Sequence, residues 1–162
     1  MEDKSIIVYA ITEKGPDIIH TNAGFSKEKL QEIALYHLLL VAQGTWHHEG
    51  LFILPIPINE INETHKAIYY GFTIYDEYQQ DPRTNKTRYG CIIVFCSNEI
   101  INEVKLIDLE AKFNELLART TNYQKLKQKT FFTQLQNFVN KQFKGKKKKI
   151  NLETLKTPTI NS

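Results

Sequence analysis

Glycine is scarce in this chain of 162 residues, and no apolar run is long. The seven glycines form neither GxGxxG nor GxxxxGK, which argues against a glycine-rich phosphate loop. The longest apolar stretch, ALYHLLLVA, is interrupted by His37 and falls far short of the roughly 20 residues of a membrane span. The acidic start, MEDK, leads into only a short apolar run and is not a secretory signal. These absences predict a cytoplasmic protein.

Cysteine is equally scarce. Cys91 and Cys96 are the only two, and they lie five apart in a predicted strand, so they point to opposite faces and are not expected to bridge. Two free buried thiols suit a reducing compartment, and a thiol inside an apolar strand behaves as a small hydrophobic group rather than a nucleophile. The serines lack a nucleophile-elbow context. We therefore predict no catalytic residue and no cofactor.

Carboxylates are almost missing from the last part of the chain. Residues 1–118 hold 10 Lys/Arg and 17 Asp/Glu, whereas residues 119–162 hold 11 basic residues and only Glu153. The predicted anion-binding residues are Lys141, Lys144, Lys146, Lys147, Lys148 and Lys149. Clustered lysines attract an anionic membrane by about 1 kcal/mol each. The aromatic and arginine platforms of base recognition are missing here, so a membrane or an acidic protein is favoured over nucleic acid.

The apolar periodicity predicts five strands and three helices. SIIVYAIT (5–12) and DIIHTN (17–22) flank the turn EKGP, and Ser26 caps a helix, KEKLQEIALYHLLLVAQ, that ends at Gly44. Three β-rich runs follow: GLFILPIPI (50–58), HKAIYYGFTIYD (65–76) and RYGCIIVFC (88–96). Helical spacing then joins Leu106, Leu109, Phe113, Leu116 and Leu117, and later Phe131, Leu135, Phe138 and Val139. The fold class expected is α+β, with helices packed on one five-stranded antiparallel sheet.

This order of elements, β-β-α-β-β-β-α-α, resembles that of longin-like domains, a branch of the profilin-like, or SNARE-like, α+β folds found in trafficking SNAREs, adaptor subunits, tethering factors and GTPase regulators. The resemblance rests on the runs quoted above, with helices from Val104 and Tyr123, and divides the chain into a domain (1–143) and a basic flexible tail (144–162). It implies a non-catalytic interaction module or scaffold. The implied partners are a small GTPase, another longin- or roadblock-type domain, or a second copy. Because no sustained heptad repeat or membrane anchor follows, a membrane-fusion role is not expected.

The resemblance also implies a sheet order of 2-1-5-4-3, which leaves residues 50–58 on an edge. Pro55 and Pro57 support that position independently, because prolines two apart lose their N–H groups on the same side of a strand. An edge without those donors should resist pairing with a strand of another chain.

The helix after Ser26 is the main candidate for partner binding. Helical spacing places Leu30, Ala34, Leu38 and Val41 on the face that covers the sheet, with Ile33, Leu40 and His37 beside them. Apolar side chains also occupy the flank, where the predicted contact residues are Leu35, Tyr36, Leu39 and Ala42. Either another part of the chain covers this flank or a protein partner docks on it.

Two further segments offer weaker candidates. Trp46, His47, His48 and Glu49 form a helix-to-strand turn, in which adjacent side chains diverge and no distant Cys or His motif completes a zinc site, so no metal is predicted. An enzyme or ligand-binding domain that uses this turn remains an alternative function, as does nucleic-acid association through the tail. The loop 77–88 is expected to be a flexible hairpin tip, and Asp81, Arg83 and Arg88 could contact a GTPase by analogy with longin-type regulators.

Overall fold

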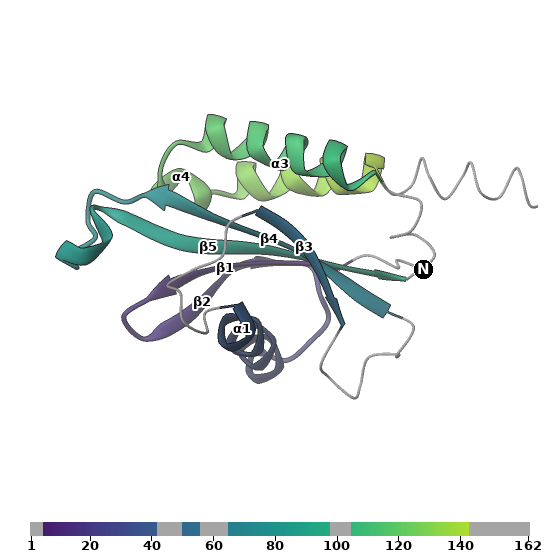
Figure 1. The fold of residues 1–162 in the computed structure, drawn as a ribbon, viewed down its shortest axis with the longest axis horizontal. Coiled ribbons are helices and arrows are strands. Elements are labelled where there is room, and N and C mark those ends of the chain that lie inside the picture. Colours follow the sequence, from purple (N-terminus) through teal and green to yellow (C-terminus); the bar gives the residue numbers. More distant parts are fainter. Residues whose placement is uncertain (1–4, 42–49, 56–64, 98–104, 143–162) are drawn as a thin grey trace, which may run out of the picture.

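The computed structural model of the chain describes residues 5–41, 50–55, 65–97 and 105–142, and the side chains of 37–41, 52–55, 65–66, 84 and 96–97 lie outside the description. Two strands, β1 (Ser5–Thr12) and β2 (Gly15–Thr21), precede α1 (Lys27–Val41), and three more strands follow: β3 (Gly50–Pro55), β4 (His65–Tyr75) and β5 (Thr87–Ser97). The chain continues through α3 (Leu106–Thr120), α4 (Tyr123–Leu126) and a last helix at 129–142 (Figure 1).

The five strands form one antiparallel sheet in the order β2-β1-β5-β4-β3. The α+β class with helices packed on the sheet is confirmed, and so are the strand order and the edge position of β3. Pro55 pairs with Lys66 at the end of that edge strand, while Pro57 lies outside the described residues. The first hairpin is tighter than expected, because Thr12 already pairs with Gly15 and Pro16 belongs to β2. Proline is tolerated there because β2 is the other edge.

Strand alternation divides the core between the two faces of the sheet. In β1, Ile6, Val8 and Ala10 pack on the face covered by α3, α4 and the 129–142 helix. Ile7 and Tyr9 point to the opposite face, under α1. Successive residues of a strand point to opposite sides, so one strand supplies both cores.

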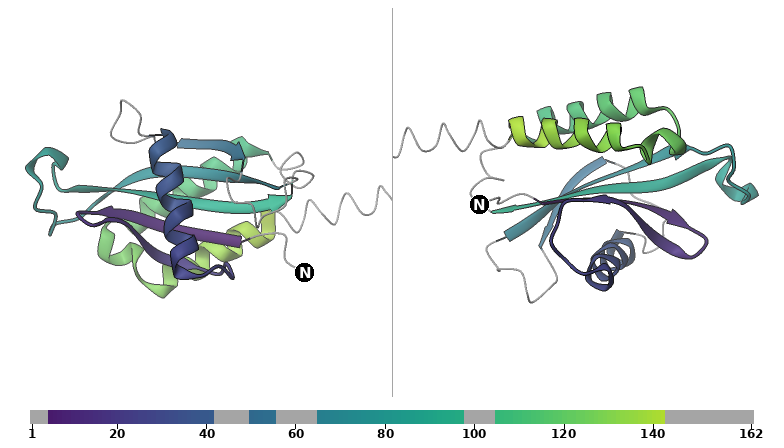
Figure 2. Two further views of the ribbon diagram at one scale, coloured as in Figure 1. Left: turned by 90° about the horizontal axis from the view of Figure 1, so that it is seen from below. Right: turned by 180° about the vertical axis from the view of Figure 1, so that it is seen from behind.

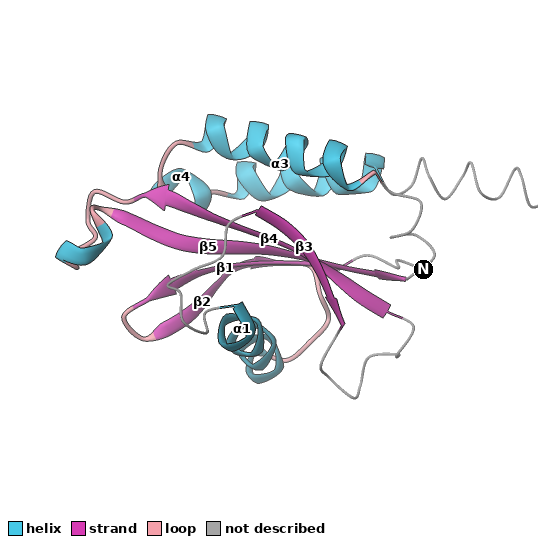
Figure 3. Ribbon diagram, viewed as in Figure 1, coloured by secondary structure: helices cyan, strands magenta, loops and turns pink. Residues whose placement is uncertain are grey.

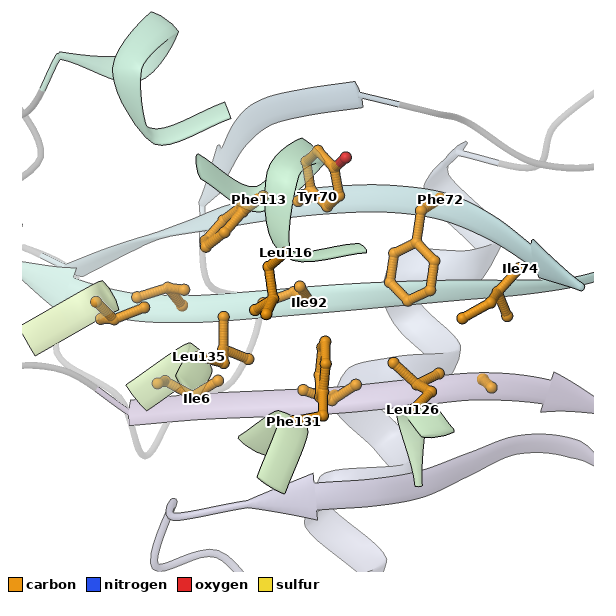
Figure 4. Packing of buried hydrophobic residues seen from close by; sticks show 14 of the residues in the cluster. Ile6, Tyr70, Phe72, Ile74, Ile92, Phe113, Leu116, Leu126, Phe131 and Leu135 are labelled. Atoms are coloured by element: carbon orange, nitrogen blue, oxygen red, sulfur yellow. The ribbon is translucent and has the colours of Figure 1, made fainter. Parts of the chain in front are cut away.

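The face under α3 carries a core of aliphatic and aromatic side chains. Phe113 of α3 packs edge-on against Tyr70 of β4, with ring centroids 5.2 Å apart, and Leu116 and Leu135 are also buried (Figure 4). Residue 90 shows how tight this packing is. A Cβ atom placed on Gly90 would lie 2.6 Å from the Phe72 ring, so the ring occupies the space of the missing side chain.

The expected continuous helix from Tyr123 is broken. Asn122 caps α4 by accepting a hydrogen bond from the Lys125 amide (2.8 Å), α4 ends at Leu126, and the 129–142 helix begins two residues after Lys127. The reason is geometric. Leu126 and Phe131 are both buried, yet five residues turn a continuous helix by about 140°, so one straight helix could not direct both side chains at the sheet.

The opposite face is crossed by α1, which runs across the strands rather than along them (Figure 2). Ser26 caps this helix as predicted, because its Oγ accepts from the Lys29 amide at 3.1 Å. Leu30, Ile33 and Ala34 are buried against the sheet, which confirms the predicted inner face as far as it is described. No helix in the described ranges is both long and apolar enough to cross a membrane.

Candidate functional site

The outer side of α1 exposes two large apolar residues next to each other. Leu35 is 47% exposed and Tyr36 is 38% exposed, although the two residues just before them, Ile33 and Ala34, are buried against the sheet. Both residues belong to the predicted contact set. Leu39 lies in α1 one turn after Leu35, with its side chain outside the description, and Ala42 lies outside the described residues. We call Leu35 and Tyr36 the α1 flank.

Exposed carboxylates lie on the same side of α1. Glu28 precedes Leu35 by seven residues, or two turns, and Glu32 precedes Tyr36 by four. Glu28 and Glu32 are exposed, and Glu32 accepts a hydrogen bond from Lys29 Nζ at 3.2 Å. The N-terminal border of the α1 flank thus carries two exposed carboxylates, of which that of Glu32 is paired with Lys29. The flank is suited to binding a surface that combines apolar and basic groups.

The β4–β5 hairpin tip is more structured than the sequence predicted. Pro82–Thr84 form a 3-10 turn, which Asp81 caps by accepting from the Arg83 amide at 3.0 Å (Figure 3). The Arg83 guanidinium also binds the Asp81 carboxylate, and these hydrogen bonds lower the pKa of Asp81 to about 2. Both predicted loop residues are therefore bonded to each other. The tip also exposes a side chain that was not predicted, Tyr78, which is 63% exposed.

Arg88, the third predicted residue of this loop, differs from Asp81 and Arg83 in its position. Arg88 lies in β5, its side chain is 10% exposed, and its Nε and Nη2 donate to Asp76 Oδ2 at 2.9 and 2.7 Å. Arg88 Nη1 also donates to the Ile11 carbonyl, and the guanidinium lies 4.7 Å from the centre of the Tyr123 ring. Burial alone would raise the pKa of Asp76, but the hydrogen bonds from Arg88, the Tyr78 amide and Gln124 lower it below its ordinary value. Arg88 therefore links β5 to β1, to Asp76 and to α4.

The groups considered for enzymatic chemistry are either engaged in the fold or outside the description. Trp46 to Glu49 lie outside the described residues. His20 stacks on Phe132, with ring centroids 5.0 Å apart, and its Nε2 lies 2.8 Å from the Leu126 carbonyl oxygen. Cys91 is fully buried, and burial raises the pKa of its thiol far above the ordinary value, so it stays protonated. Among the described side chains, no three His, Cys, Asp or Glu groups converge as metal ligands.

Lys141 is exposed near the end of the 129–142 helix, and the predicted lysines from Lys144 onward lie outside the described residues.

The structure also contains a pocket that the sequence did not predict. The pocket, of about 190 Å³, lies at the start of the 129–142 helix, where α3 ends and α4 follows. Its lining residues are Arg119, Thr120, Lys125, Gln128, Thr130, Phe131 and Gln134. The lining residues come from the end of α3, from α4 and the residues after it, and from the start of the 129–142 helix, so only the folded chain brings them together.

Comparisons with family models, with curated proteins and with solved structures gave no match to this chain.

Proposed function

We propose that this protein is a non-catalytic, longin-like interaction module of small-GTPase or membrane-trafficking machinery. The observation that carries the proposal is the α1 flank, where Leu35 and Tyr36 stay exposed on the helix that covers one face of the sheet. An exposed apolar pair on a regular helix is a typical protein contact surface. The strand order and the placement of helices on both faces support the longin-like assignment.

The partner we propose for the flank is a protein that presents apolar side chains bordered by basic ones. Glu28 and Glu32 would meet that basic border, and charge complementarity of this kind speeds association and selects the partner. Each sheet edge carries a proline at or near one end of its strand, Pro16 on β2 and Pro55 on β3, and proline lacks the backbone donor that strand addition uses. The lysine-rich tail (144–162) would in addition approach an anionic membrane.

The first test compares the mass in solution, by light scattering, of the wild type, Leu35→Glu and Ile107→Glu. Ile107 is the matched control, because it is 83% exposed on α3 and lies on the other layer of helices. A dimer that only Leu35→Glu dissociates would identify the partner as a second copy. A dimer that resists Leu35→Glu would place the contact elsewhere and overturn the proposal.

A wild-type monomer leads to the second arm, in which a photo-crosslinking amino acid replaces Tyr36 or, as control, Ile107 in the native cell. A crosslinked protein specific to position 36, and lost with Leu35→Glu, supports a different protein as partner. The absence of any product specific to position 36 would overturn the role of the flank.

A further inference from the structure

The pocket beside α4 has the size of a small polar group. Its volume of about 190 Å³ is below the roughly 300–1,000 Å³ of sites that enclose drug-sized ligands. Phe131 lines it but is only 4% exposed, so it offers no open ring on which a nucleobase could stack. The pocket therefore suits one compact group better than a whole nucleotide.

The charge of the lining is positive. Arg119 and Lys125 line the pocket, no Asp or Glu does, and within the described ranges neither cation is paired with a carboxylate. The surrounding sequence extends this pattern, since residues 116–142 contain Lys127, Lys129 and Lys141 and no Asp or Glu. An uncompensated pair of cations in a concave site favours an anion over a metal ion.

The hydrogen-bonding groups of the lining match phosphate. A guanidinium such as that of Arg119 can bind two phosphate oxygens at once, and Lys125 adds a compact positive charge. Thr130 and Gln134 supply uncharged donors, whereas the Phe131 amide in the first turn of the 129–142 helix already donates to the Gln128 carbonyl at 3.1 Å. The Thr120 hydroxyl is already used, because it donates to the Leu116 carbonyl at 2.8 Å.

We propose that this pocket binds a phosphate group of the phosphomonoester type, carried either by a lipid headgroup or by a small soluble molecule. The site would bind and not hydrolyse, because its lining holds no carboxylate, histidine or cysteine. The 129–142 helix spans about 20 Å, from Lys129 near the pocket to the point where the lysine-rich tail follows. This proposal rests on the membrane part of the proposed function and deepens it, because a lipid phosphate bound in the pocket would add to the attraction of the lysine-rich tail for anionic lipid.

The test is a titration of the full chain with inorganic phosphate, followed by amide NMR shifts. The variants are Arg119→Gln/Lys125→Gln and the control Lys27→Gln/Lys112→Gln, which removes the same charge from exposed positions on α1 and α3. We expect shifts around residues 119–134, with affinity at least about tenfold weaker in the pocket variant and unchanged in the control, because charge-assisted hydrogen bonds are lost. Absent shifts, or equal affinity in the wild type and the pocket variant, would overturn the proposal.

Vesicle sedimentation then separates the two sources of phosphate. Stronger binding to phosphatidylcholine vesicles that carry a phosphoinositide than to charge-matched phosphatidylserine vesicles, with the difference lost in the pocket variant, supports a lipid headgroup. No preference between the vesicles, together with pocket-dependent shifts, supports a soluble phosphomonoester. Replacement of Lys146 to Lys149 by Gln should weaken binding to both vesicles and leave the phosphate titration unchanged, so a failed tail and a failed pocket are distinguishable.

Discussion

The two faces of the sheet are covered in different ways. On one face, α3 and the 129–142 helix run along the strands, and on the other α1 crosses them (Figures 1 and 2). The first face buries a continuous core in which Tyr70 reaches the rim and its hydroxyl donates to Asn114. The second buries Tyr9 and Cys91 completely beneath α1, while Leu35 and Tyr36 stay exposed on the outside.

This difference suggests separate roles for the two faces: the α3 face would contribute most to stability, and the outer side of α1 would bind a partner. The layer of α3 and the 129–142 helix buries its core side chains against the sheet but exposes Ile107 on α3, and around α4 and the 129–142 helix its surface is basic and polar. The α1 layer keeps part of its apolar surface outside. Under the proposed function, a protein partner would bind the α1 flank and an anionic group would bind the basic side of the molecule. Three substitutions test how far the faces differ, from the largest expected effect to the smallest.

Phe113→Ala should cause the largest loss of stability. Phe113 is fully buried between α3 and β4, and removing such a ring costs about 3–5 kcal/mol through lost burial and the cavity left behind. Urea unfolding followed by circular dichroism measures the loss. Glu115→Ala, at an exposed position of the same helix, is the control and should change little. A loss below about 1 kcal/mol for Phe113→Ala would contradict the view that this face carries the stability.

Arg88→Gln should lower the free energy of unfolding by about 3 kcal/mol at neutral pH, because it leaves the buried Asp76 carboxylate without its charged partner. The pKa of Asp76 is lowered in the folded protein, so its stabilising contribution is present above its unfolded pKa of about 3.9 and is lost as the pH falls through the folded value. The difference between the wild type and Arg88→Gln should therefore shrink in acid. Unfolding curves from pH 7 to pH ~3 check this, and a difference that does not vary with pH would exclude Asp76 as its source.

Tyr9→Phe probes the α1 face and should cost about 1 kcal/mol, the net value of a typical hydrogen bond. Tyr9 is fully buried beside Cys91, to which its hydroxyl is hydrogen bonded, and burial raises the pKa of this hydroxyl so that it stays neutral. Tyr78→Phe, which removes an exposed hydroxyl, is the control for thermal unfolding. A Tyr9→Phe variant more stable than the wild type would show that the buried Tyr9 hydroxyl destabilises the folded protein.

Periodicity was enough to predict the five strands, α1 and α3, but not the break after α4. Alternating residues in β1 and the spacing of Leu109, Phe113 and Leu116 depend on local geometry, whereas the order of strands was expected from the resemblance to longin-like domains. The two prolines pointed to an edge because the loss of a backbone donor is a local property.

The contacts at the end of the sheet were harder to predict. Arg88 was read as a loop residue because a charged side chain next to a polar segment is usually solvated. A signal was nevertheless present, since Ile74 pairs with Arg88 and Asp76 lies diagonally across the hairpin on the same face. No comparable signal in the sequence predicted the pocket. Arg119 and Lys125 come from different helices, and only the break after α4 brings the start of the 129–142 helix beside them.

The contact between Gly90 and Phe72 has a consequence for the descent of this sequence. A side chain at position 90 would collide with the ring at position 72, so the two positions share one volume across the β4–β5 pair. A larger residue at 90 would require the Phe72 ring to move or to be replaced by a smaller side chain, and it would also crowd the Tyr9 carbonyl oxygen, which would lie 3.2 Å from the added Cβ atom. We therefore expect substitutions at positions 72 and 90 to be correlated in relatives of this chain.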